Sequence, residues 1–285
     1  MNWRKARRVM RREYAESVRK KSFLFGLLAT PLMMLGLIAL PLLAGGELDV
    51  GTADPGGGLA DQVYFRAVAL VMIMFFALIP TGQILMRSVI EEKASRVIEV
   101  LLSSVTATEL MVGKIVGLGT VGLTLVGTWA AIGALIAWRL GGGFPIGGAD
   151  AGMFLLYFLP GYFFYAALLG SIGSICHAER DAQPFLTPIS LMLILPVMLG
   201  FAIAQNPDHF LVRIASFVPF FAPSLMMFRW TLHAPPPWEI AATWTALVAA
   251  TCVMFWASSR IFRVGILLTG KRPTVAEVAR WIRAR

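Results

Sequence analysis

Residues 67–86 read AVALVMIMFFALIPTGQILM, an unbroken stretch without a charged side chain. At a rise of about 1.5 Å per residue, a helix of this length matches the hydrocarbon core of a bilayer, which is roughly 30 Å thick. A surface helix of a soluble protein rarely stays uncharged for so long, because one of its faces must meet water. The stretch therefore predicts a membrane-spanning helix.

Five other runs have the same character, and short polar loops separate them. The six runs are Ser22–Ala44, Ala67–Met86, Ile115–Trp138, Ala151–Cys176, Ala182–Gln205 and Ile240–Ser259. With their polar ends, they predict helices over about 22–44, 64–86, 109–138, 151–176, 182–205 and 239–262. Hydrophobic residues make up 58% of the chain and charged residues 14%. We expect an all-α, polytopic membrane protein whose six-span bundle (22–262) is its main domain.

The net charge of +9 lies on one side of these predicted spans. The segments 1–21, 87–114, 177–181 and 260–285 hold 21 of the 25 Lys and Arg residues, whereas the loop 45–61 is acidic and has no basic residue. This asymmetry is typical of cytoplasmic and outer loops, respectively. We expect a multi-pass protein of the cell (plasma or inner) membrane with both termini in the cytoplasm, and the lipid bilayer rather than nucleic acid as the partner of its charge.

The first 21 residues predict an amphipathic helix at the cytoplasmic interface. Trp3, Ala6, Met10, Tyr14 and Val18 recur at three- and four-residue spacing, and arginines occupy the other face. Such a helix lies in the membrane interface, where its arginines meet anionic lipid. The alternative is that these charges only set the topology.

A second amphipathic segment is predicted between spans two and three, over 88–103. One face is apolar, and the other carries Glu92, Ser95, Arg96 and Glu99. Thr106 and Glu109 then have the spacing of a capping box, which predicts a new helix start. A short helix that faces the cytosol between two spans is a candidate docking element; the alternative is a solvated charged loop.

Two further segments lie outside the six spans. The segment 209–230 has a short apolar centre that contains Pro219 and Pro223, so it predicts a re-entrant or interfacial helical pair on the outer side rather than a seventh span. The tail 263–285 is basic, and Thr274 with Glu277 predicts a short helix within it.

Two enzyme motifs are incomplete. Gly265–Arg272 matches a phosphate loop except that Arg272 stands where a Ser or Thr must bind magnesium, so we expect no ATP hydrolysis by this chain. Glu91–Arg96 fits the E-E-x-x-x-R pattern of intramembrane CAAX-type metalloproteases, and His177 with Asp181 could complete a second element. However, no Phe-x-x-x-His precedes any histidine. We expect no catalytic residue, metal site or cofactor in the chain.

Ionisable residues are missing from the predicted span interiors, which argues against an ion-coupled secondary transporter. The polar candidates for a substrate path are Gln83 in span two and Thr120, Thr124 and Thr128 on one face of span three. The threonines can instead bond to carbonyls of their own helix. Small residues at four-residue spacing, Gly113 and Gly117 and also Ala166, Gly170 and Ser174, predict close helix packing.

The stretch EEKASRVIEVLLSSVTATELMVGKIVG at Glu91–Gly117 resembles the membrane subunit of type-2 ABC exporters, in the sodium-efflux NatB-like permease branch. The stretches Arg12–Phe23, Val218–Arg229 and Arg263–Pro273 are also similar to this family. The resemblance implies a six-span subunit that forms a homodimer, or pairs with a paralogous permease, and recruits separate soluble ABC ATPase subunits that bind ATP and Mg.

The resemblance also implies that the segment 88–103 is the coupling helix. The residues that it assigns to ATPase docking, either in the groove or as anchors on the bundle, are Glu91, Glu92, Lys93, Arg96, Ile98, Glu99, Leu102 and Ser103. The chain departs from this branch at the loop 45–62, where members often carry a large folded domain. We therefore expect the permease subunit of an ATP-driven exporter, with a CAAX-type metalloprotease or an ATP-independent secondary transporter as alternatives.

Overall fold

The computed structural model describes residues 3–20, 23, 27, 57–95, 97–139 and 147–265, which form helices and no strand. This finding confirms the predicted all-α class for that part of the chain. The helices in it are α1 (Trp3–Arg19), α3 (Gly57–Ala94), α4 (Val97–Ser104), α5 (Ala107–Arg139), α6 (Gly148–Ile175), α7 (Glu179–Met198), α8 (Gly200–Gln205), α9 (Phe210–Ser216), α10 (Ala222–Leu232) and α11 (Pro237–Gly265).

Five of the described helices are long and apolar enough to cross a membrane: α3, α5, α6, α7 and α11. They correspond to the second through sixth predicted spans. The first predicted span, 22–44, lies almost entirely outside the described residues, and so does the tail after Gly265.

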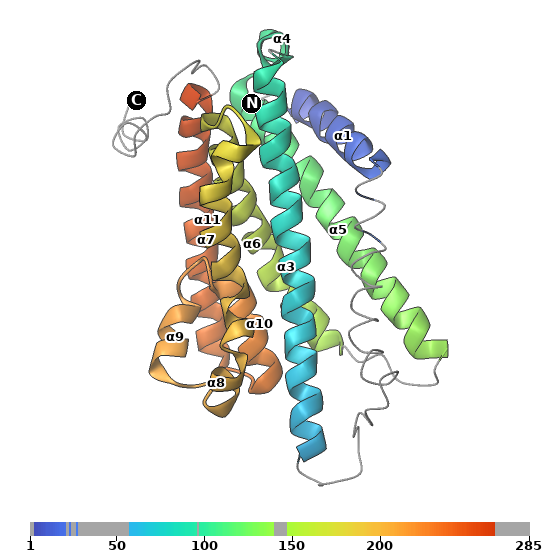
Figure 1. Cartoon of the computed structure of the whole chain (residues 1–285), viewed down its shortest axis with the longest axis vertical. Helices are drawn as coiled ribbons and strands as arrows, with labels where there is room; N and C mark the ends of the chain where they lie inside the picture. The colour runs from blue at the N-terminus through green and yellow to red at the C-terminus, as the bar shows by residue number, and fades with distance from the viewer. Residues whose placement is uncertain are drawn as a thin grey trace.

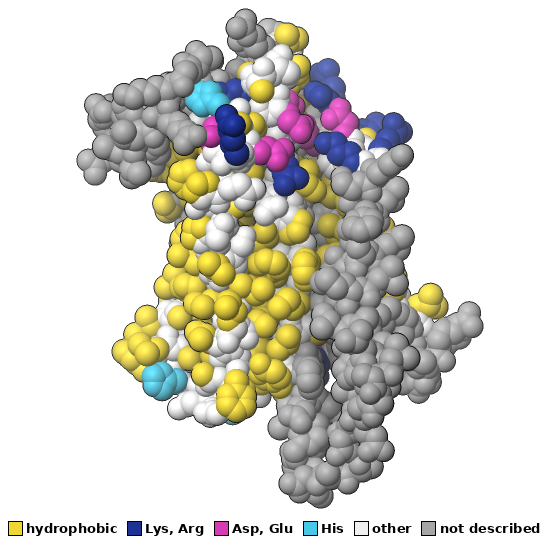
Figure 2. Space-filling model, viewed as in Figure 1, with side chains coloured by type: hydrophobic (Ala, Val, Ile, Leu, Met, Phe, Trp, Pro, Cys, Tyr) yellow, Lys and Arg dark blue, Asp and Glu magenta, His cyan; other side chains and the backbone are white. Residues whose placement is uncertain are grey.

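The long helices run side by side, and α3 stands along the bundle while α5 tilts away from it (Figure 1). The α4 helix projects at one end of the bundle, close to α1 and to the C-terminal end of α11, and α8 and α9 lie at the opposite end. Figure 2 shows charged side chains gathered at the α4 end and a broad apolar surface below them. An apolar band of this kind is the surface that lipid tails cover.

Small residues let the central helices approach closely. A Cβ atom at Gly173 of α6 would lie 2.7 Å from the carbonyl oxygen of Met86 in α3, and one at Gly170 would lie 3.4 Å from the Leu85 side chain. The close approach of α6 to α3 thus lies at Gly173, whereas Gly170, one of the small residues predicted to pack closely, makes an ordinary van der Waals contact. Without a hydrophobic driving force between helices in lipid, such backbone proximity is a main source of helix association.

The predicted span 182–205 is corrected to two helices. The α7 helix contains Pro184, Pro188 and Pro196 and ends at Met198, and α8 begins at Gly200. Each proline removes a backbone donor, so the helix is weakest where Pro196 and Gly200 lie four residues apart. A Cβ atom at Gly200 would lie 2.8 Å from the Tyr64 hydroxyl oxygen, so glycine permits this break to pack on α3.

The predicted helical pair at 209–230 corresponds to α9 and α10. Arg229 of α10 is fully buried and pairs with Glu239 at the start of α11. Its guanidinium also donates to the Pro207 carbonyl at 3.0 Å and to Asp208 at 3.1 Å. We call Pro207, Asp208, Ser216, Arg229 and Glu239 the Arg229 cluster; it joins α9 and α10 to α11.

The predicted helix over 88–103 is also corrected. Residues up to Ala94 are the last turns of α3, and α4 begins only at Val97. The Ser95 backbone N–H and hydroxyl both donate to the Glu91 carbonyl, at 3.0 and 2.8 Å, where the α3 helix ends. The docking segment therefore comprises the end of α3 and a separate short helix.

Candidate functional site

Lys114 of α5 is fully buried at the end of the bundle where α4 projects. Its ammonium group lies 2.8 Å from Glu13 of α1 and 2.9 Å from Glu92 of α3, and it donates to the Ser88 hydroxyl at 2.6 Å. All three hydrogen-bond donors of the ammonium thus have partners. We call Glu13, Ser88, Glu92 and Lys114 the Lys114 junction; it joins α1, α3 and α5.

Glycines on α5 bring α1 close enough to form this junction. A Cβ atom at Gly113 would lie 2.7 Å from the Val9 Cβ, and one at Gly117 would lie 2.8 Å from the Met10 carbonyl oxygen. The close packing predicted for these two glycines is confirmed, and its partner is α1. Glu13 lies on the same packed face as the buried Ala6, so its carboxylate points at α5 rather than at water.

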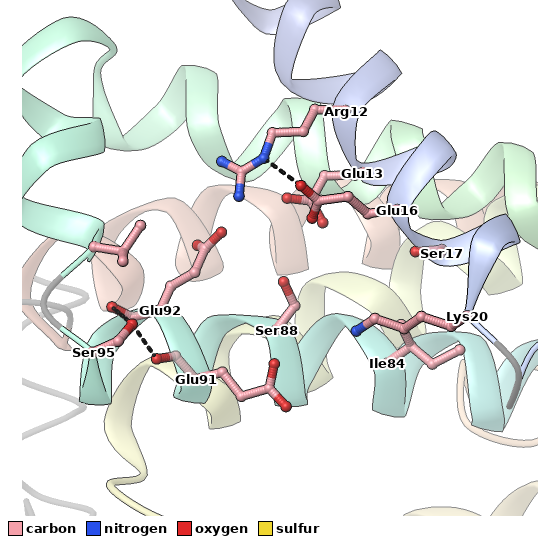
Figure 3. Close-up of a pocket in the computed structure, with 11 residues that line it drawn as sticks. Arg12, Glu13, Glu16, Ser17, Lys20, Ile84, Ser88, Glu91, Glu92 and Ser95 are labelled. Carbon is pink, nitrogen blue, oxygen red and sulfur yellow. Dashed lines mark hydrogen bonds and ion pairs between the residues drawn. The ribbon is translucent and has the colours of Figure 1, made fainter.

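A polar cavity of about 210 Å³ adjoins the Lys114 junction, between α1 and the end of α3. In Figure 3, Glu13 and Glu16 extend from α1 toward the Ser88 and Glu92 side chains of α3. Arg12 lies at its rim and bonds to Glu16 at 2.8 Å. Its hydrogen bond with Glu16 raises the pKa of Arg12 above its ordinary value, and the charges of Glu92 and Glu13 act in the same direction.

The charge of the junction does not balance locally. One ammonium group faces two carboxylates, and the second Glu92 oxygen (Oε2) is buried without a hydrogen-bond partner. A buried polar atom without a partner costs roughly 1–3 kcal/mol, unless water reaches it. The adjacent polar cavity is large enough for water. Lys114 therefore has a full set of partners, whereas the Oε2 oxygen of Glu92 depends on water from the cavity.

The next residue, Lys93, points the other way around α3. Its ammonium group donates to the Ser174 carbonyl of α6 at 2.8 Å and to the Gly265 carbonyl of α11 at 2.7 Å. Carbonyls at helix C-terminal ends lack intrahelical partners and attract cations. Arg87, which precedes Lys93 in α3, pairs with Glu179 of α7 at 3.3 Å. The end of α3 thus contacts all the other candidate span helices through charged groups.

The α4 helix stands on this end of α3. Its Ile98 side chain is buried, whereas Val100 is 71% exposed and Val97 is 39% exposed. The capping box predicted for the start of α5 is confirmed, because Thr106 and Glu109 exchange hydrogen bonds of 3.1 and 3.3 Å. Lys5 of α1 also donates to the Ser104 carbonyl at 2.7 Å. Contacts with α1 and the start of α5 therefore fix the position of α4.

The structure separates the residues that the sequence assigns to ATPase docking. Glu91 is exposed, Glu92 belongs to the Lys114 junction, Lys93 binds carbonyls of α6 and α11, and Ile98 is buried. Arg96 and the side chains of Glu99, Leu102 and Ser103 lie outside the described residues. Glu92 and Lys93 thus face into the bundle, because their charged ends find partners there.

The candidate substrate-path residues do not form one site. Gln83 is half-buried on α3, whereas the three threonines follow α5. Thr120, Thr124 and Thr128 each donate to a carbonyl of α5, at 2.6, 2.8 and 2.8 Å. These bonds match the alternative interpretation, in which the threonines bond to carbonyls of their own helix rather than line a substrate path. Thr124 also contacts the Tyr14 hydroxyl of α1 at 3.3 Å.

Sequence reasoning missed Glu13 and Lys114 as site residues. Lys114 looked like part of the cytoplasmic charge that sets topology, and Glu13 looked like one acid in a basic helix. A signal was present, however: Lys114 stands between Gly113 and Ile115 in an otherwise apolar run. A lone cation in such a run must find a buried partner once its helix packs.

The sequence of this chain is similar to those of known proteins. The family described as ABC-2 family transporter protein matches residues 50–260. The uncharacterized protein MJ1024 of Methanocaldococcus jannaschii is 31% identical over 75% of this chain and 53% of its own length. The uncharacterized protein YhaP of Bacillus subtilis is 28% identical over 75% of this chain and 55% of its own length.

The chain thus spans about half the length of the curated relatives it matches. No solved structure matches it at a significant level. The family match covers most of the chain, including α3 to α10 and nearly all of α11. The chain belongs to the ABC-2 transporter family, and its candidate span helices make it a multi-pass membrane protein.

Proposed function

We propose that the chain is the permease subunit of an ATP-driven exporter in the cell membrane, that it acts as a dimer, and that separate ATPase subunits dock on α4. In this proposal, the α4 end of the bundle and both termini are cytoplasmic. The family match supports the transport role.

The observation that carries the proposal is that Glu92 and Lys93, at the end of α3 next to α4, point to opposite sides of that helix. Glu92 bonds to Lys114 of α5, and Lys93 bonds to the carbonyls of Ser174 and Gly265. A displacement of α4 would therefore reach both α5 and the α6–α11 pair through short, direct contacts. A partner that moves with ATP hydrolysis needs such a rigid connection, because packed elements transmit discrete shifts rather than gradual deformation.

The exposed surface of α4 fits a docking role. Val97 and Val100 are apolar side chains exposed beside Glu91, at the end of the bundle where Figure 2 shows charged side chains. Apolar anchors surrounded by charge are typical of protein interfaces. Each subunit of a dimer would offer one such tip, which matches two ATPase subunits.

The test is to purify the tagged full chain with its ATPase from the native membrane. We expect Val100→Asp with Glu91→Lys to abolish co-purification of the ATPase while membrane insertion stays normal. The matched control is Arg180→Glu, an exposed charge reversal on α7. ATP hydrolysis by the reconstituted complex is then measured with candidate substrates.

Two results would contradict the proposal: an ATPase that stays bound and coupled to the Val100→Asp, Glu91→Lys variant, and transport by the pure chain without nucleotide. The second result would favour a secondary transporter. Charge reversal at Glu92 is a poorer docking test, because it would break the Lys114 junction as well.

A further inference from the structure

A second hollow lies on the other side of α1, between α1 and α5. This groove has a volume of about 730 Å³ and is lined by Arg4, Arg7, Arg8 and Arg11 with Met10, Tyr14, Thr120 and Thr124. The four arginines have i, i+3, i+4 and i+7 spacing, so one face of α1 presents them all. We call it the arginine groove.

The charges of α1 are sorted between its two sides. Glu13 and Glu16 line the polar cavity toward α3, whereas among the described residues no carboxylate lines the arginine groove. Guanidinium groups bind phosphate with two parallel hydrogen bonds, and their charge adds to that geometry. A groove of several guanidiniums without an acid favours a phosphate ligand.

The α5 wall of the groove supplies acceptors rather than donors. Thr120 donates its hydroxyl proton to the Gly117 carbonyl, and Thr124 donates to the Thr120 carbonyl. Their oxygens can therefore only accept from a ligand. A phosphate linked to a group that bears hydroxyls would satisfy both walls, because the phosphate meets the arginines and a hydroxyl donates to Thr120.

The position of the groove indicates the source of this phosphate. Thr120 and Thr124 lie within the apolar candidate span of α5, and Leu123 between them is 39% exposed. The threonine wall of the groove thus lies beside exposed apolar surface of a candidate span, which suits a headgroup followed by acyl chains. A soluble phosphate would use only the upper part of such a surface.

We propose that the arginine groove binds the headgroup of an anionic phospholipid of the cytoplasmic leaflet, with a hydroxyl-bearing headgroup such as glycerol preferred. This is a discrete site, beyond the general attraction of a basic helix to an anionic membrane. The lipid site can be tested independently of the proposed transport function, because the experiment measures lipid binding and not transport.

The test is native mass spectrometry of the purified full chain in neutral detergent, titrated with phosphatidylglycerol or with phosphatidylcholine. We expect phosphatidylglycerol to bind one site per chain. Arg7→Gln with Arg11→Gln should weaken this binding about 30-fold, since each basic residue near the surface contributes about fivefold to the affinity. Arg7→Lys with Arg11→Lys keeps the charge and is expected to lose less. The matched control, Arg19→Gln with Arg180→Gln, removes two exposed charges outside the groove and should leave the affinity unchanged.

A second variant tests the hydroxyl contact. Thr120→Val keeps the shape of the wall and removes an acceptor, so the preference for phosphatidylglycerol over phosphatidic acid should fall by about threefold, as for one neutral hydrogen bond. An unchanged preference would overturn the assignment of the headgroup hydroxyl to Thr120.

Other results would overturn the lipid site itself. Equal binding of phosphatidylcholine, or an equal loss in the control variant, would mean that no specific site exists. Displacement of the lipid by inorganic phosphate or glycerol 3-phosphate would assign the groove to a soluble anion. If Arg7→Gln with Arg11→Gln separates two copies of the chain, or releases the ATPase in lipid-free detergent, the groove is a protein interface.

Discussion

The Lys114 junction and the Arg229 cluster each bury one cation among acids, at opposite ends of the bundle, yet they are built differently. The Arg229 cluster takes its partners from residues 207–239, a local part of the chain. The Lys114 junction joins residues 101 and 22 positions away, from two other helices. The first holds a segment in place, and the second holds separate helices together.

Their surroundings differ as well. The second carboxylate oxygen of both Glu239 and Glu92 is buried and makes no hydrogen bond. That of Glu239 still faces Arg213 as an ion pair at 3.3 Å, whereas Glu92 lies beside a polar cavity. An acid held between two arginines is constrained by both charges, whereas an acid that water can reach exchanges partners at lower cost. We therefore expect the Lys114 junction to rearrange more readily than the Arg229 cluster.

The largest effect on stability is expected at the Arg229 cluster. Arg229→Met leaves Glu239 buried without its main partner, and we expect the free energy of unfolding in detergent micelles to fall by about 3–5 kcal/mol. The control is Arg213→Met, whose side chain is 40% exposed, and which should cost less, because Arg229 still neutralises Glu239. Equal losses of unfolding free energy in the two variants would mean that the burial of Arg229 does not make it more important for stability than Arg213.

The Lys114 junction should respond less in stability and more in motion. Lys114→Met strands Glu13 and Glu92, but the cavity can hydrate them, so we expect a loss of about 2–3 kcal/mol. Hydrogen exchange should rise along α1 and remain unchanged in α10. Combining Lys114→Met with Glu13→Gln and Glu92→Gln should restore part of the stability; an α1 helix that stays protected in Lys114→Met would contradict the junction.

A third effect concerns the glycines that bring α1 to α5. A Cβ atom at Gly117 would lie 2.8 Å from a backbone oxygen of α1, whereas one at Gly127 has no atom within 4 Å. We expect Gly117→Ala to cost about 1–2 kcal/mol and to loosen α1. Gly127→Ala on the same helix is the matched control and should be neutral or stabilising by up to about 1 kcal/mol. Similar thermal unfolding of the two variants would refute the close contact.

The smallest effect is expected at the threonine stripe. Thr128 donates to the Thr124 carbonyl within α5, so Thr128→Val should change the free energy of unfolding by less than about 0.5 kcal/mol. Transport by the reconstituted complex should also remain unchanged if the stripe only bonds its own helix. A strong loss of transport with normal stability would restore Thr128 to a substrate path.

The sequence by itself determined the parts of this protein that depend on local composition. Uncharged runs such as 67–86 fix the spans, because a bilayer core admits only helices whose backbone is internally bonded. The same holds for the capping box at Thr106 and Glu109, since both partners lie within one turn. The break at Leu199 was missed, although Pro196 and Gly200 flank it, because tolerance of proline in a membrane helix depends on what packs against it.

Only the tertiary structure decided which charges are surface charges and which hold the bundle together. Glu92 and Lys93 are adjacent in the sequence and looked equally suited to a cytosolic partner, yet one reaches α5 and the other reaches α6 and α11. The surroundings of Glu92 and Lys114 depend in turn on Gly113 and Gly117, which allow α1, and with it Glu13, to pack beside Lys114. The energy of a charge depends on its neighbours in space, and residues 101 positions apart become neighbours only when the helices pack.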